Sequence, residues 1–84
     1  MTNYDNYLLN RISMDAAICN GKPVIRGMRF TVAQMLELVA AGMTFDEIIS
    51  DYPYLEREDI SACLIYASSM ANYKGMIPFE KQIA

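Results

Sequence analysis

The sequence contains no histidine and no tryptophan, and only two cysteines, Cys19 and Cys63. Histidine is the commonest general base in enzymes, and neither cysteine has a basic neighbour that would activate its thiol. The cysteines also lack the spacing of a zinc site, and the glycines lack the spacing of a phosphate-binding loop. The composition therefore argues against an enzyme and predicts neither a cofactor nor a metal.

Long hydrophobic runs and targeting segments are missing as well. No stretch approaches the roughly 18–20 apolar residues that cross a bilayer. Met1–Asn10 has neither the basic start nor the apolar run of a signal peptide. Cys63 falls on an apolar helical face, which predicts a buried free thiol and a reducing compartment. We therefore expect a cytoplasmic protein that does not contact membranes.

Apolar residues, by contrast, are abundant for so short a chain. They make up 54% of 84 residues, although a domain of this size buries only roughly 60–65% of the surface of its unfolded chain. This excess favours an apolar interface in addition to a core, and a homodimer supplies one. The alternative is a generous core within a monomer.

The net charge of −3 argues against non-specific binding of nucleic acid, which needs a basic surface. The charges are unevenly distributed, because acidic residues concentrate in the second half of the chain. Between Gly21 and Phe30, in a segment we name the basic loop, every charged residue is basic: Lys22, Arg26 and Arg29. Any contact with DNA should therefore involve the basic loop.

Turn signals divide the chain into three parts. Residues 1–10 read as an N-terminal arm that is ordered only if its aromatic side chains dock, residues 11–72 as the domain and residues 73–84 as a C-terminal tail. At the start of the domain, Arg11–Ser13 and Val24–Ile25 predict short strands around a turn at Asn20–Pro23.

Three helices follow, and capping signals mark where each begins. Thr31 with Gln34 and Thr44 with Glu47 have the spacing of capping boxes, while a third helix opens after Glu56, a poorer cap. The carboxylate pairs Asp46-Glu47 and Glu58-Asp59 suit the positive ends of helices. The expected ends are Gly42, Pro53 and Asn72.

The apolar residues in these helices repeat at helical spacing, so each helix has one stripe to bury. Hydrophobic staples flank the three starts: Phe30 with Met35, Met43 with Ile48, and Leu55 with Ile60. Three such stripes cannot be buried in pairs, whereas a right-handed three-helix cluster buries them all. The sequence therefore predicts a mainly α fold, a helix-turn-helix bundle preceded by short β-strands.

One extended motif resembles a known family. Arg11-Ile12-Ser13, the run Ile18-Cys19-Asn20-Gly21-Lys22-Pro23-Val24-Ile25-Arg26-Gly27, and Tyr52-Pro53 are similar to the signature of the domain-of-unknown-function 433 family. The resemblance covers about residues 11–67. It implies a homeodomain-like three-helix fold, and it implies an antitoxin of a bacterial type II toxin–antitoxin pair, similar to VapB-type antitoxins. The implied partner is a PIN-like ribonuclease toxin.

The sequence departs from this family pattern at three positions. Met28 stands where Thr or Ser is usual, Glu56 replaces the usual Thr cap, and Ser61 occupies a position that is often basic. The third helix, which would read bases in a helix-turn-helix protein, is therefore acidic at its start and has Arg57 as its basic residue. This composition weakens the case for reading of the major groove.

The basic loop supplies the first candidate site. Lys22, Arg26 and Arg29 could hold phosphate oxygens, while Gly21, Pro23 and Gly27 shape the turn and let the backbone approach a duplex. The alternative is that Gly27 serves a tight turn and that Arg26 or Arg29 pairs with an acidic residue. The acidic residues considered as partners are Asp46 and Asp51.

Three further candidates each have a structural alternative. Arg57, Ser61 and Tyr66 could read bases, or the charged start of this helix could simply be solvated while the helix packs on the core. Val24 and Ile25 could form a dimer by pairing strand edges, or they could lie in a hairpin within the monomer. The tail could order on a partner or dock on its own domain or the dimer mate, through its apolar residues Met76, Ile77 and Phe79.

These observations lead to one functional prediction and an alternative. The prediction is a dimeric DNA-binding regulator of antitoxin type, which binds operator DNA weakly and neutralises a PIN-like ribonuclease. The alternative is a protein-interaction module with the same fold that does not bind DNA.

Overall fold

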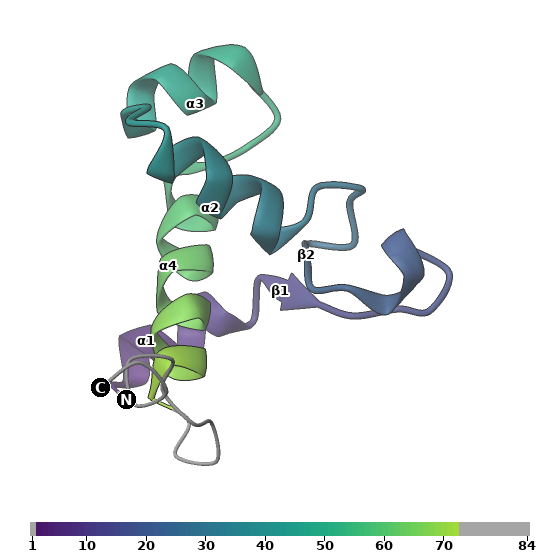
Figure 1. Cartoon of the computed structure of the whole chain (residues 1–84). Helices are drawn as coiled ribbons and strands as arrows, with labels where there is room; N and C mark the ends of the chain where they lie inside the picture. The colour runs from purple at the N-terminus through teal and green to yellow at the C-terminus, as the bar shows by residue number, and fades with distance from the viewer. Residues whose placement is uncertain (1, 73–84) are drawn as a thin grey trace, which may run out of the picture.

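The computed structural model describes residues 2–72, so the predicted tail, with Met76, Ile77 and Phe79, lies outside the described residues. In that range the chain is mainly helical, with four helices and a short two-stranded sheet (Figure 1). The elements are α1 (Asn3–Leu9), β1 (Ile12–Ser13), a 3-10 turn (Cys19–Gly21), β2 (Val24–Ile25), α2 (Val32–Ala40), α3 (Phe45–Asp51) and α4 (Arg57–Ala71). The predicted mainly α class is confirmed, with one helix more than the sequence predicted.

The additional helix is α1, in the segment predicted to be an arm. A capping box begins it, because the hydroxyl of Thr2 accepts the backbone N–H of Asp5 at 3.0 Å and the Asp5 carboxylate accepts the N–H of Thr2 at 3.2 Å. The helix packs against α4 and buries Leu8, which is 2% exposed. Tyr4 and Tyr7 remain 59% and 55% exposed, so the aromatic residues are not what orders this segment.

The two strands pair antiparallel, with Ile12 opposite Ile25 and Ser13 opposite Val24. The other edge of β2 is also occupied, because Val24 forms a bridge with Thr31 and the backbone N–H of Ile25 donates to the carbonyl of Phe30 at 3.0 Å. Val24 and Ile25 are both 0% exposed. The proposed pairing of two chains through this strand is therefore corrected to the alternative, a hairpin within the monomer.

The three predicted helices begin and end where the sequence indicates. Thr31 and Thr44 accept the N–H groups of Gln34 and Glu47. The Thr44 box is complete, since Glu47 accepts the N–H of Thr44 at 2.7 Å, whereas at Thr31 only the bond from the N–H of Gln34 is formed. Glu56 behaves as the poorer cap that was expected. Its backbone N–H donates to the Asp59 carboxylate at 2.8 Å, which orders the first turn of α4.

The core forms where α2, α3 and α4 meet the hairpin. Its buried members include at least one partner from each predicted staple and the Cys63 thiol: Ile25, Phe30, Val32, Met35, Ile48, Leu55, Ile60 and Cys63. Burial of each large apolar side chain contributes about 1.5–3 kcal/mol. Among the helices in the described range, none has the length and apolarity needed to cross a membrane.

Candidate functional site

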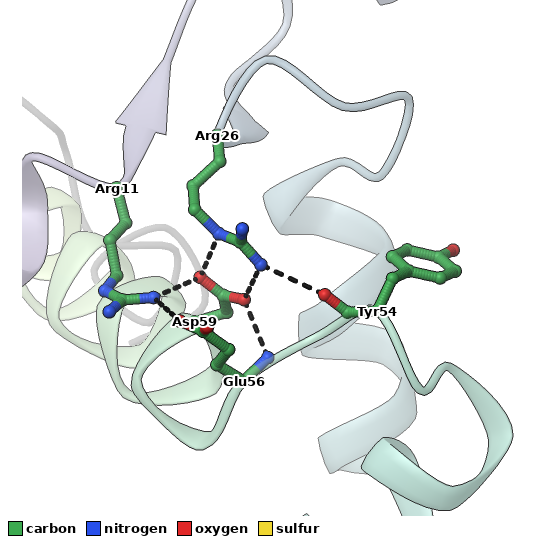
Figure 2. A network of polar contacts seen from close by, with 5 residues as sticks. All are labelled: Arg11, Arg26, Tyr54, Glu56 and Asp59. Carbon is green, nitrogen blue, oxygen red and sulfur yellow. Dashed lines mark hydrogen bonds and ion pairs between the residues drawn. The ribbon is translucent and has the colours of Figure 1, made fainter.

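The first turn of α4 holds a carboxylate inside the protein. The side chain of Asp59 is 0% exposed, and each of its oxygens accepts two hydrogen bonds (Figure 2). Oδ1 accepts from Nη1 of Arg11 at 2.9 Å and from Nε of Arg26 at 3.0 Å. Oδ2 accepts from Nη2 of Arg26 at 2.7 Å and from the backbone N–H of Glu56 at 2.8 Å. The acceptor capacity of the carboxylate is therefore filled.

Two segments distant from α4 supply the arginines. Arg11 lies between α1 and β1, and it also pairs with the exposed carboxylate of Glu56 at 2.7 Å. Arg26 lies in the turn after β2, and its Nη2 also donates to the carbonyl of Tyr54 at 3.1 Å. The backbone N–H of Arg26 donates to the carbonyl of Arg11 at 2.7 Å. We name Arg11, Arg26, Glu56 and Asp59 the charge cluster; it joins the hairpin to the start of α4.

The turn that carries Arg26 depends on left-handed backbone geometry. Arg26 has a φ of 46° and Gly27 a φ of 70°, and the N–H of Met28 donates to the carbonyl of Ile25 at 2.8 Å. Two successive left-handed residues are typical of tight hairpin turns. A Cβ added at Gly27 would meet nothing within 4 Å, so the glycine serves the turn conformation and not a close approach. Gly21, with a φ of 82°, has the same conformational role before Pro23.

The charge cluster keeps Asp59 ionised. Burial alone would raise the pKa of Asp59, but the hydrogen bonds from Arg26, from the N–H of Glu56 and from Arg11 outweigh it and hold the pKa below its ordinary value. The carboxylates in turn raise the pKa values of Arg11 and Arg26. Because the Asp59 carboxylate has no free acceptor position, this arrangement suits a structural ion pair and not proton transfer or metal binding. Among residues 2–72, no group of three potential metal ligands occurs.

The charge cluster changes the interpretation of the basic loop. Arg26 has the intramolecular pair given above as the alternative, but its partner is Asp59 and not Asp46 or Asp51. Lys22 and Arg29 are exposed, and neither forms an ion pair with another residue of the described range. The structure therefore separates the three cations into one that is paired with a buried carboxylate and two that are not paired with any residue of the described range.

Arg57 and Ser61 are two of the candidate DNA-binding residues on α4. Arg57 pairs with Asp46 at 2.5 Å and lies over the ring of Phe45, 5.4 Å from its centroid. Asp46 is therefore the partner of Arg57 and not of the basic loop. Ser61 is half-buried, and the helix residues exposed beyond it include Leu64 and Ser68. Within Arg57–Ala71, Arg57 is the only basic residue.

Arg11 and Asp59 are the residues that the sequence analysis missed as a site. Glu58-Asp59 was explained as a pair suited to a helix N-terminus, although Glu58 is exposed and Asp59 is buried. The available signal was the spacing of Asp59, which lies four residues before Cys63 and therefore on the apolar face of the helix. A carboxylate on that face is buried and therefore needs a cationic partner. Arg11 and Arg26 were suitable candidates, because both are arginines in the segment that precedes the helices.

Two further features of the site region concern apolar groups. Cys63 is a buried free thiol, as predicted, and burial together with the charge of Asp59 raises its pKa to about 12. An apolar groove of about 280 Å³ lies between α2 and α4. Its walls come from both helices and from the residue before β2: Pro23, Val32, Ala33, Leu36, Tyr66, Ala67 and Met70.

Comparison with known proteins identifies the family. No curated protein and no solved structure matches the chain. The model of one family matches residues 12–67, which include β1, both glycine turns, α2, α3 and most of α4. This match spans more than half of the chain and contains Arg26 and Asp59. The chain thus belongs to the family described as protein of unknown function DUF433.

Proposed function

We propose that this chain is an antitoxin-like protein-interaction module, and that it acts in the cytoplasm by binding a protein partner. The observation that carries the proposal is the bidentate pair between Arg26 and Asp59. It removes the central cation of the basic loop from the set available to phosphates. The family resemblance supplies the class of partner, a PIN-like ribonuclease.

The proposed scaffold is a homeodomain-like helix-turn-helix unit formed by α2, α3 and α4. In such a unit the last helix reads base edges, usually with unpaired basic and amide side chains. Here Arg57 is already paired with Asp46, and the exposed residues of α4 include Glu58 and Leu64. An acidic and apolar surface of this kind suits contact with a protein better than contact with phosphates.

The partner contact that we propose lies on α1. Tyr4 and Tyr7 stack on each other, with ring centroids 6.2 Å apart, and more than half of each side chain is exposed. Exposed, pre-ordered tyrosines contribute large contact areas at small entropic cost, and tyrosine is enriched at interface hot spots. The docking of Leu8 on α4 holds α1 in place, so the pair is presented on an ordered helix.

Co-expression with a ribonuclease encoded next to this chain tests the proposal. The parent should co-purify with the ribonuclease and suppress its cleavage of RNA, whereas Tyr4→Ser/Tyr7→Ser should bind at least about tenfold more weakly, because truncation of a hot spot costs about 2 kcal/mol or more. Asn3→Ser/Asn6→Ser is the matched control, since it alters two exposed residues of the same helix. No complex with the parent, or equal binding by all three chains, would contradict the proposal.

Weak binding of operator DNA is a second candidate, which the exposure of Lys22 and Arg29 favours. A homodimer would present two such pairs, and the affinity would fall steeply with salt. In a gel-shift titration at low and near-physiological salt, Lys22→Ala/Arg29→Ala should abolish any shift that the parent gives. A parent shift that survives in this variant, or no shift even at low salt, argues against the basic loop as a DNA contact.

A further inference from the structure

The apolar groove between α2 and α4 is open to solvent at one end of the long helix. Met70 in its wall is 56% exposed, and Ala33 on the opposite wall is exposed as well. All the residues that line it in the described part of the chain are uncharged. Its volume is about 280 Å³. A groove of this size with an uncharged lining suits a few apolar side chains.

We propose that the C-terminal tail, residues 73–84, turns back along α4 and that its apolar segment Met76–Phe79 fills the groove of the same chain. The proposal rests first on position. The groove is lined by Tyr66, Ala67 and Met70, and α4 ends at Ala71, so the tail begins within one turn of the groove.

The length of the tail is sufficient for this path. The helix rises about 1.5 Å per residue, so the groove extends roughly 9 Å back from Asn72 to Tyr66. An extended chain advances about 3.3 Å per residue, so Met76 and Phe79 can lie up to roughly 13 and 23 Å from Asn72. Both limits exceed the length of the groove, so the segment can reach it without being fully extended. Gly75 precedes the segment, and glycine accepts the backbone conformations that a reversal needs.

The chemistry of the segment also matches. Residues 75–79 contain no charge and include three large apolar side chains, Met76, Ile77 and Phe79. A tail tethered this close has an effective concentration in the millimolar range, which exceeds that of a second copy at micromolar protein. The occupant is therefore the tail of the same chain, and a partner could contact these three residues only after displacing them from the groove.

Disulfide trapping in the isolated protein tests this proposal independently of any partner or DNA. Ala33→Cys and Ile77→Cys are introduced together in a Cys19→Ser background; Cys63 is retained because it is buried and its pKa is raised to about 12, which keeps the thiol unreactive. The control pairs Ile77→Cys with Ser50→Cys, which is exposed on α3 outside the groove. Urea unfolding of each reduced variant first establishes that it is folded.

In a glutathione buffer the groove pair should form an intramolecular disulfide at least about tenfold faster than the control pair, because docking raises the local concentration of the two thiols. Mass spectrometry and a non-reducing gel identify the product. Equal rates for the two pairs would overturn the proposal. A covalent dimer as the main product of the groove pair would overturn it too, since it assigns the groove to the tail of a second copy.

Discussion

Arg26 and Asp59 form a bidentate ion pair, with Nε to Oδ1 at 3.0 Å and Nη2 to Oδ2 at 2.7 Å, that joins the turn after β2 to the first turn of α4 (Figure 2). Both residues lie within the segment matched by the family model. The Val-Ile-Arg-Gly part of the motif thereby has a physical explanation: the strand is buried, the arginine holds α4 and the glycine permits the turn. The residues of this motif therefore attach the hairpin to α4.

Asp59→Asn should destabilise the protein strongly. The amide keeps the shape of the side chain but leaves Arg11 and Arg26 without their shared anion. Removal of one partner of a fully buried pair costs about 3–5 kcal/mol, and we expect the lower end of this range because the two arginine side chains are 17% and 37% exposed. Urea unfolding followed by circular dichroism measures the change. Asp46→Asn is the matched control, because Asp46 is 89% exposed in its pair with Arg57, and surface pairs contribute about 0–1 kcal/mol. Equal effects of the two substitutions would contradict the role of the cluster.

The stabilisation from Asp59 should depend on pH in one direction. In the folded protein the hydrogen bonds from Arg26, from the N–H of Glu56 and from Arg11 hold the pKa of Asp59 below its ordinary value. The contribution is therefore fully present above the unfolded pKa and is lost as the pH falls through the lower, folded pKa. The difference in unfolding free energy between the parent and Asp59→Asn should stay constant from pH 7 to 5 and shrink below about pH 4. A difference that is unchanged at pH 3 would show that Asp59 is not the titrating group.

Arg26 allows the ion pair and the backbone strain to be separated. Its φ of 46° lies in the left-handed region, where a non-glycine residue costs about 1–2 kcal/mol. Arg26→Ala and Arg26→Gly both remove the guanidinium, but only glycine relieves the strain. We expect both variants to be less stable than the parent, and Arg26→Ala to be about 1 kcal/mol less stable than Arg26→Gly. The usual order, with alanine the more stable, would contradict the left-handed conformation.

The helices α2, α3 and α4 could be predicted because their signals are local. Each start is set within six residues by a cap and a staple, and each stripe repeats along one segment. The charge cluster could not be predicted in this way, because Arg11, Arg26 and Asp59 come from three distant segments. Their proximity depends on the hairpin register and on the packing of α4, which no local pattern encodes. The same reason explains why Asp46 was considered as a partner for the basic loop, although it pairs with Arg57.

The missed helix α1 has a different cause. Its capping box, Thr2 with Asp5, follows the same rule as the caps that were recognised, but the order of the segment was judged by its aromatic residues. A seven-residue helix is too short to be stable alone. What stabilises it is the burial of one leucine on α4, and a single apolar contact gives no periodic signal. The order of this segment therefore depends on tertiary packing.

Leu8→Ala tests this dependence. Removal of the buried side chain takes away the main apolar contact of α1 with α4, and a Leu→Ala change in a core costs about 2–5 kcal/mol. Because α1 is short, we expect it to undock locally, so that its backbone amides exchange with solvent at least about tenfold faster while those of α2 and Ile60–Cys63 keep their protection. Tyr7→Ala, at an exposed position one residue away, is the control and should leave the exchange rates of α1 within about threefold of the parent. If Tyr7→Ala exposes the α1 amides as much as Leu8→Ala does, the aromatic side chains order the segment after all.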